Sequence, residues 1–299
     1  MSTINYSIII PHHNSPEKLE RCISSIPIRE DVEVIIVDDN SSLTIVDFER
    51  FPGKNKDNYK ILLQKEGKGA GYARNQGLIH ARGKWIIFSD ADDEFYTENL
   101  SFVMDKYIDS SVDIVYFNSD VINADTLAVE NLKLEIYKHI DCNHSSDIEW
   151  FRYKLTVPWG KFVKKELLST YQIKFDEVIA GNDVMFSLQS GHFAKEVVVD
   201  KTSIYKWFCY KKGNITSMVS KEAVISKFGV ALRRLDFLSQ NCKLRYRTNL
   251  FINYVPLFMK AGYSFAMSYS IVFKHIPRKY RLFDSISFMF FSVKKMFNK

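Results

Sequence analysis

The sequence is poor in cysteine, and its cysteines are scattered. Only four occur among 299 residues, and no two are spaced as CxxC: Cys22, Cys142, Cys209 and Cys242. This spacing excludes a cysteine-based zinc site and a small scaffold held by disulfides. Reduced thiols are the normal state in the cytoplasm, so we expect a cytoplasmic protein.

Long hydrophobic runs are also missing. The N-terminus lacks the basic stretch of a signal peptide, and the apolar run at residues 6–10 is too short for one. Residues 251–273 come nearest to a membrane span, but Pro256, Lys260 and Gly262 interrupt them. A span needs about 20 mainly apolar residues. We therefore predict that no helix of this chain crosses a membrane.

Glycine-rich phosphate loops are absent as well. Residues 11–18 (PHHNSPEK) follow the first apolar run and contain no glycine. A nicotinamide or flavin enzyme would carry GxGxxG at such a place, and a P-loop nucleotidase would carry GxxxxGK[ST]. The sequence therefore argues against both classes of nucleotide-binding enzyme.

Acidic residues are nearly absent from the last part of the chain. Residues 241–299 carry 11 Lys or Arg and a single acid, Asp284, whereas the whole chain has a net charge of +6. Aromatic side chains lie between these cations, a composition typical of helices that contact an anionic inner-membrane surface. Packing onto the main domain and a homodimer contact are the alternatives. No recognition motif indicates a nucleic-acid partner.

Short β-branched runs alternate with helix-like segments along residues 1–218. The sequence predicts strands at 6–10, 32–37, 60–63, 84–88 and 113–117, and helices at 16–26, 71–81 and 99–107. This alternation is typical of a doubly wound α/β domain with a mostly parallel sheet. Residues 150–170 suggest a loop followed by a helix. Residues 219–299 are predicted to form a C-terminal helical, basic and aromatic-rich extension.

Acidic side chains follow two of the predicted strands. Asp38 and Asp39 come after the second, and Asp90, Asp92 and Asp93 come after the strand at 84–88. Parallel sheets bind ligands where the carboxyl ends of their strands meet. Acids in such turns are often only good turn residues. Three like charges in four residues repel one another, however, and this favours a bound divalent cation.

Six segments in order resemble the family 2 glycosyltransferases, which have the GT-A fold. They read SIIIPHHNSPEKLERCISSI, VEVIIVDDNSS, GAGYARNQGL, GKWIIFSDADD, WGK and GNDVMF. The resemblance covers about residues 5–215. It implies an enzyme that transfers a hexosyl or N-acetylhexosaminyl group from a nucleotide-sugar, with inversion at the anomeric carbon. It also implies a nucleotide-sugar donor, with uridine diphosphate as the preferred nucleotide.

The resemblance assigns roles to individual residues. It places the donor nucleotide against Pro11, Asn14, Asp38, Asp39, Arg74 and Asp90. Asp92 corresponds to the ligand of a divalent metal, Mn²⁺ or Mg²⁺. Asp183 corresponds to the general base, although an acid at that point could equally cap a helix.

The remaining assignments concern the sugars and the biological setting. Trp159, Lys161 and Asn182 are expected to line an acceptor or donor-sugar pocket. Asn182 stands where the family usually has Glu, so the alternative is a catalytically silent nucleotide-sugar-binding protein of the same fold. The expected acceptor is a saccharide or lipid-linked saccharide in bacterial surface polysaccharide synthesis, of a capsule or O-antigen.

Overall fold

The computed structural model describes residues 3–129, 145–209 and 219–297. The chain forms two compact units. The first comprises Met1–Glu177 and Asn182–Lys212, and the second comprises Val178–Gly181 and Gly213–Lys299. The short segment 178–181 therefore belongs to the second unit, although its neighbours on both sides belong to the first.

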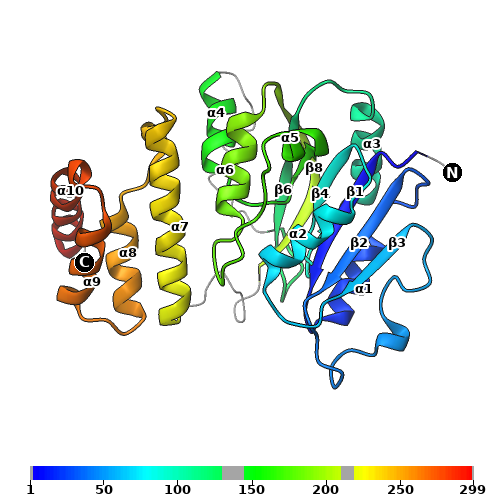
Figure 1. Ribbon diagram of the computed structural model, residues 1–299, viewed down its shortest axis with the longest axis horizontal. Helices are drawn as coiled ribbons and strands as arrows, with labels where there is room; N and C mark the ends of the chain where they lie inside the picture. Colours follow the sequence, from blue (N-terminus) through cyan, green and yellow to red (C-terminus); the bar gives the residue numbers. More distant parts are fainter. Residues whose placement is uncertain (1–2, 130–144, 210–218, 298–299) are drawn as a thin grey trace. The chain divides into compact units, whose positions relative to one another are not determined.

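An eight-stranded sheet forms the centre of the first unit (Figure 1). Its order is β3-β2-β1-β4-β7-β6-β8-β5. The strands are β1 (Tyr6–His12), β2 (Val32–Asp38), β3 (Tyr59–Leu63), β4 (Trp85–Phe88), β5 (Glu94–Phe95), β6 (Ile114–Asn123), β7 (Lys161–Lys164) and β8 (Val197–Cys209). β1 to β4 pair in parallel, while β7 runs antiparallel to both β4 and β6. The expected doubly wound, mostly parallel arrangement is confirmed.

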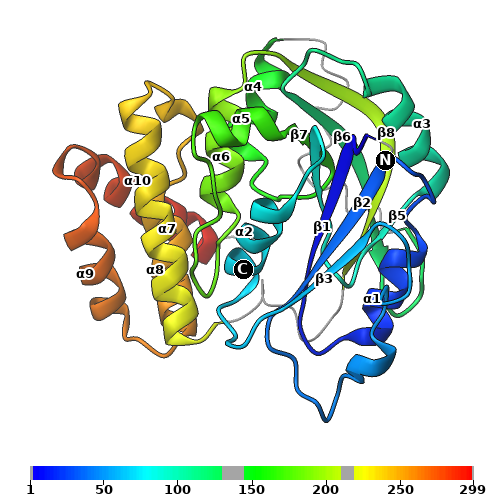
Figure 2. The same ribbon diagram turned by 45° about the vertical axis from the view of Figure 1, so that its right-hand side comes forward.

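Helices cover both faces of this sheet (Figures 1 and 2). On one face, α1 (Pro16–Ser24) and α3 (Thr97–Tyr107) pack on the apolar side chains of β1 and β2. The other face is covered by α2 (Ala70–His80), α4 (Ser145–Lys154), α5 (Lys165–Thr170) and α6 (Val184–Phe193). Each central strand is therefore buried on both sides, which explains its continuous apolar sequence.

The prediction for residues 150–170 was wrong in part. The segment begins inside α4, and it contains strand β7 at Lys161–Lys164 before helix α5. Two of the four residues of β7 are lysines, so the strand lacks the apolar run by which the others were found. Pairing with β4 and β6 on either side overrides this weak local preference. The strand predicted at 113–117 is real and continues to Asn123.

The second unit is helical. It contains α7 (Lys221–Gln240), α8 (Leu250–Lys260), α9 (Phe265–His275) and α10 (Arg278–Phe297). Its core is a cluster of apolar side chains from all four helices, including Phe228, Leu235, Phe251, Val255, Val272 and Phe288. Within the part of the chain that the structure describes, no helix is long and apolar enough to cross a membrane.

Two helical glycines differ in the space around them. Gly77 of α2 lies against β1, and a Cβ atom there would lie 2.3 Å from Ile9 Cγ2. Gly229 of α7 has open space, because the nearest atom to a new Cβ is Arg233 Nη1 at 4.0 Å. Replacing glycine with alanine should therefore change the stability of the protein in opposite directions at the two positions.

We predict that Gly77→Ala lowers the free energy of unfolding by about 1–3 kcal/mol, since the added methyl group overpacks the core. Gly229→Ala should raise it by about 0.5–1 kcal/mol, because alanine favours a helix interior. Urea unfolding of both variants measures these changes. A Gly77→Ala protein as stable as the wild type would contradict the close packing of α2 on β1.

Candidate functional site

The ends of β1, β2 and β4 meet at one edge of the sheet. His12 at the end of β1 is in register with Asp38 at the end of β2. Ile9 of β1 is in register with Phe88, the last residue of β4. The polar segments after these parallel strands therefore lie side by side, as expected for the binding edge of an open α/β sheet.

A buried hydrogen-bond network fixes the ends of β1 and β2. The Ser15 amide donates to His12 Nε2 at 3.2 Å, so His12 Nδ1 carries the proton that it shares with Asp38 Oδ1 at 2.8 Å. Asp38 also accepts from the amide and hydroxyl of Ser41, at 2.9 and 2.6 Å. Burial raises the pKa of Asp38, but these donors outweigh burial and leave its pKa below the usual value. At 1% exposure, Asp38 faces inward and holds the loops together.

The other predicted residues of this region form the rim. Asn14 adopts a left-handed φ of 50°, and its side-chain oxygen accepts from the Ser42 amide at 2.8 Å. Asp39 accepts from the amides of Lys68 and Gly69, at 2.9 and 2.8 Å. It therefore connects the end of β2 to the start of α2. Pro11 is partly buried within β1 itself.

Arg74 connects the acidic turn after β4 with the segment that precedes α6. Its guanidinium is 7% exposed and forms an ion pair with Asp90 Oδ1. The other terminal nitrogen donates to Asn182 Oδ1 at 2.8 Å. Space is tight here, because a Cβ at Gly71 would lie 2.1 Å from the carbonyl oxygen of Asp176. Three predicted site residues, Arg74, Asp90 and Asn182, are thus in direct contact.

The three acids after β4 have different surroundings. Asp93 is 1% exposed and accepts from the Phe208 amide and the Tyr205 hydroxyl, both at 2.8 Å. Burial raises the pKa of Asp93 well above the usual value. The same Tyr205 hydroxyl accepts from the Asp90 amide at 2.9 Å. Asp93 therefore attaches the turn to β8. The repulsion expected among three like charges is then left to the two partly exposed carboxylates, those of Asp90 and Asp92.

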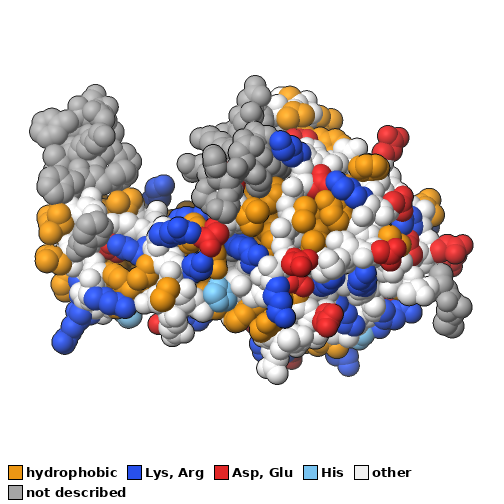
Figure 3. Space-filling view, turned by 90° about the horizontal axis from the view of Figure 1, so that it is seen from above, with side chains coloured by type: hydrophobic (Ala, Val, Ile, Leu, Met, Phe, Trp, Pro, Cys, Tyr) orange, Lys and Arg blue, Asp and Glu red, His pale blue; other side chains and the backbone are white. Residues whose placement is uncertain are grey.

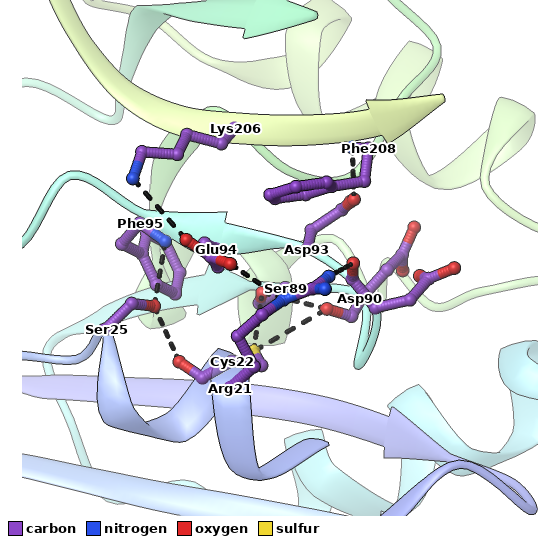
Figure 4. A network of polar contacts seen from close by, with 11 residues as sticks. Arg21, Cys22, Ser25, Ser89, Asp90, Asp93, Glu94, Phe95, Lys206 and Phe208 are labelled. Atoms are coloured by element: carbon purple, nitrogen blue, oxygen red, sulfur yellow. Dashed lines mark hydrogen bonds and ion pairs between the residues drawn. The ribbon is translucent and has the colours of Figure 1, made fainter. Parts of the chain in front are cut away.

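Arg21 of α1 holds the backbone of this turn, as Figure 4 shows. One guanidinium nitrogen donates to the carbonyl oxygen of Asp92 at 2.7 Å, and another pairs with Glu94 at 2.7 Å. The guanidinium also lies 4.3 Å from the ring centroid of Phe208. No motif in the sequence points to Arg21, because only its place on α1 brings it to a turn 71 residues away.

Asp92 presents its carboxylate outward. Its side chain is 39% exposed, with Lys18 Nζ 3.8 Å away. Burial, and then the charge of Asp90, raise the pKa of Asp92. No group of three or more His, Cys, Asp or Glu that could hold a metal occurs among the residues described. Magnesium, however, is commonly held by one or two carboxylates together with phosphate oxygens of the substrate. A single outward carboxylate fits that kind of binding.

Asp183 precedes α6 at the N-cap position, but its side chain makes no capping hydrogen bond. Asp183 thus stands at the helix start, as the helix-cap alternative expected, but its carboxylate is not used for a capping hydrogen bond. Burial raises the pKa of Asp183, while the positive charges of Arg74 and Lys161 lower it. An ionisable carboxyl group that is raised in pKa and not used by the helix is a suitable proton acceptor.

Trp159 and Lys161 lie deeper than a sugar pocket would require. Trp159 is 4% exposed and stacks on Tyr205, with ring centroids 5.1 Å apart. Lys161 is 1% exposed. Trp207 continues the stack at 6.2 Å from Trp159 and is partly exposed. Trp207, and not Trp159, is therefore the partly exposed ring of this stack.

Taken together, a mixed α/β sheet covered by helices on both faces, with polar residues after its parallel strands, has the arrangement of the GT-A fold. A profile of the family described as Glycosyl transferase family 2 matches residues 7–166, more than half of the chain. The chain belongs to this family.

Individual relatives agree with this assignment. The uncharacterized glycosyltransferase YibD of Escherichia coli K12 is 24% identical over 218 residues, which are 70% of this chain and 62% of YibD. The Escherichia coli UDP-Glc:alpha-D-GlcNAc-diphosphoundecaprenol beta-1,3-glucosyltransferase WfgD is 28% identical over 40% of this chain and 48% of its own. The chain thus spans less than two thirds of either protein.

A solved structure has the same fold. Residues 1–349 of TarS from S. aureus, in complex with UDP-GlcNAc, superpose with a TM-score of 0.63 at 19% identity. The match covers 93% of this chain and 73% of the TarS chain. At this identity the likeness concerns the fold.

The contact between Arg74 and Asn182 leads to a prediction. Asn182→Leu has a similar volume but no acceptor, so it should leave a buried guanidinium N–H unpaired and lower the transfer rate at least about tenfold. Asn182→Asp retains an acceptor oxygen and should keep most of the activity. Steady-state kinetics on both variants test this. Equal activities of the two variants would show that the contact does not matter.

Proposed function

We propose that this chain is an inverting glycosyltransferase that moves a sugar from a nucleoside-diphosphate sugar to an acceptor hydroxyl. The observation that carries the proposal is the contact of Arg74 with both Asp90 and Asn182. It brings the acidic turn, which suits a donor, next to Asp183, which suits a base. A uridine diphosphate sugar is the preferred donor, supported by the UDP-GlcNAc bound to TarS and the UDP-Glc in the name of WfgD.

The donor nucleotide is assigned to the rim of the sheet edge. Pro11 and Asn14 form the floor under the base, and Asp39 accepts a hydrogen bond from it. Each carboxylate oxygen of Asp39 has a second lone pair beyond its bond to a backbone amide. Asp38, bonded to His12 and Ser41, contributes by holding these loops and not by touching the nucleotide.

The diphosphate is assigned to the turn after β4. Asp90, oriented by Arg74, faces the ribose, and Asp92 is the residue that would hold Mg²⁺ or Mn²⁺. A divalent ion at this place supplies positive charge to the departing diphosphate. Arg21 binds the backbone carbonyl of Asp92 and thereby holds the turn that carries this side chain.

Asp183 is the proposed general base. The acceptor oxygen attacks the anomeric carbon, the bond from that carbon to the diphosphate oxygen breaks, and the acceptor proton passes to the Asp183 carboxylate. A single displacement of this kind inverts the anomeric centre. The raised pKa of Asp183 increases its affinity for the proton, while Arg74 and Lys161 favour its ionised form beforehand.

Catalysis is favoured over the alternative of a silent nucleotide-sugar-binding protein. That alternative depended on the missing Glu at position 182. Asn182 still offers an oxygen to Arg74, as a carboxylate at that position would. The replacement therefore preserves the contact that orients the segment before the base.

The acceptor is proposed to be a saccharide or lipid-linked saccharide of a bacterial surface polysaccharide, such as a capsule or O-antigen. The diphosphoundecaprenol acceptor in the name of WfgD supports a lipid-linked acceptor. Such an acceptor lies at a membrane, and the second unit has a surface suited to one.

That surface is defined by α9 and α10. Exposed apolar side chains include Phe265, Met267, Leu282 and Met289, each more than half exposed. The one acid of residues 241–299, Asp284, is fully buried and pairs with Arg247 at 2.8 Å. Figure 3 shows Lys and Arg side chains beside hydrophobic ones on the side of the helical unit that it presents. We propose that this surface contacts the inner leaflet peripherally, with a homodimer contact as the alternative.

Asp183→Asn tests the catalytic assignment. We expect the turnover rate to fall about 10²–10⁴-fold, the usual contribution of a general base. The dissociation constant for the donor should change less than about twofold, because the base acts on the acceptor. Transfer assays and calorimetric titration with UDP-sugars measure the two quantities. The exposed Asp109→Asn is the matched control, and normal turnover by Asp183→Asn would refute the assignment.

Vesicle binding tests the surface of the second unit. Leu282→Glu combined with Met289→Glu should reduce flotation with vesicles that contain anionic lipid by at least about tenfold, because each change adds repulsion and removes apolar contact. Ile225→Glu on α7, also exposed, is the control. If the double variant floats normally but changes its sedimentation coefficient, the surface is a dimer contact instead.

A further inference from the structure

Lys161 is a lysine with no access to water. It begins β7, and only 1% of the residue is exposed. Its ammonium donates to Ser187 Oγ at 3.2 Å and lies 5.4 Å from the ring centroid of Tyr116. Enclosing an ammonium group is unfavourable unless an opposite charge or hydrogen-bond acceptors compensate for the lost water. The enclosed position of Lys161 therefore suggests that its charge has a function.

Ser187 places this ammonium relative to the proposed base. The Ser187 amide donates to the Asp183 carbonyl at 3.0 Å, so Ser187 lies one helical turn after Asp183. Its hydroxyl is near the carbonyls of Thr156 and Val157, at 2.9 and 3.1 Å, and donates its single proton there. The lone pairs of Ser187 Oγ are then available to Lys161. The ammonium therefore lies beneath the first turn of α6, on the side that carries Asp183.

The charged groups around this pair come from several elements. Arg74 of α2 and Asp90 after β4 act on Asp183, with opposite signs. Tyr116 of β6 faces Lys161, and Arg152 and Tyr153 of α4 act in turn on Tyr116. The carboxylate of Asp183 is the charge that acts on Lys161 itself.

The titration of the two groups is linked. Burial lowers the pKa of Lys161 to about 7, and the negative charge of Asp183 opposes this shift. Burial raises the pKa of Asp183, and the positive charge of Lys161 opposes that shift. Lowering the pH through this range charges the lysine and thereby favours the carboxylate form of Asp183, and raising the pH removes that influence.

We propose that Lys161 is a positioning residue that keeps Asp183 ionised, so that Asp183 can accept the proton of the acceptor hydroxyl. The inference rests on the proposed role of Asp183 as the base. It replaces the sugar-pocket role expected from the sequence, because a residue 1% exposed does not touch a sugar. After transfer, the same positive charge favours release of the proton from Asp183 and restores the base for the next turnover.

The pH dependence of kcat/KM distinguishes this role from simple packing. In Lys161→Met the side chain keeps a similar length without its charge. Asp183 then becomes protonated at higher pH, and the acid limb should move upward by about one pH unit or more. At pH values well below the midpoint of the new acid limb, kcat/KM of Lys161→Met should be about tenfold lower than that of the wild type. Above about pH 8 the difference in kcat/KM should be less than about threefold, since the wild-type lysine is itself largely uncharged there.

Control variants distinguish the effect of losing the Lys161 charge from the effect of a folding defect. Lys164→Met, in the same strand, should leave the acid limb in place, and Lys161→Arg should retain the wild-type limb. If Lys161→Met fails to fold, Lys161→Gln carries the same expectation, because it keeps an N–H donor for Ser187. Circular dichroism and donor binding report on the fold. A loss that is equal at every pH, or an acid limb that does not move, overturns the inference.

Failure of the role proposed for Lys161 can be distinguished from failure of the role proposed for Asp183. If Asp183→Asn turns over normally, Asp183 is not the base and both ideas fail. If Asp183→Asn is inactive while Lys161→Met shows an unmoved acid limb, the base assignment stands and only the role of Lys161 is overturned.

Discussion

The buried guanidinium of Arg74 is the interaction on which the candidate site depends. It pairs with Asp90 on the turn after β4 and with Asn182 on the segment before α6. These two segments are far apart in sequence and come from different parts of the first unit. A planar group with several fixed donors can hold both at defined angles, which a lysine cannot do. Its charge also opposes the repulsion between the carboxylates of Asp90 and Asp183.

The surrounding polar groups serve mainly to hold loops. His12, Asp38 and Ser41 join the first two strand ends, and Asp93 with Tyr205 joins the acidic turn to β8. Each of these groups is buried and has hydrogen-bond partners, so the cost of removing it from water is offset. Asn14, the nearly buried Asp39 and the outward-facing Asp92 are thereby held on a rigid support. Such support is what a donor with a flexible diphosphate requires of its protein.

Much of the fold could be predicted from the sequence because the central strands are apolar on both faces. The runs in β1, β2 and β4 are continuous, so neither their type nor their parallel pairing was ambiguous. Strand β7 was missed because two of its four residues are lysines and only its neighbours make it a strand.

The site was predicted by residue type better than by orientation. Asp90, Asp92 and Asp93 are chemically the same in the sequence, yet Asp93 turns inward because Tyr205 and Phe208, more than a hundred residues later, offer it donors. Lys161 was likewise expected at a surface and is enclosed. Such orientations depend on contacts between residues that are far apart in the sequence, and the spacing of neighbouring residues does not indicate these contacts. Arg74 and Asp183, by contrast, were found from the order of motifs, and the structure brings them within electrostatic reach of each other.

The four residues 178–181 have a consequence for the modularity of this protein. They belong to the helical unit, where Ser226 of α7 bonds both the amide and the carbonyl of Ala180, at 3.2 and 2.9 Å, and Val230 lies 3.5 Å from the Cβ position of Gly181. The next residues along the chain are Asn182 and Asp183. The helical unit is therefore not an appendage that evolution could exchange by recombination at a single junction. A successful exchange must transplant this internal tetrapeptide together with the helices.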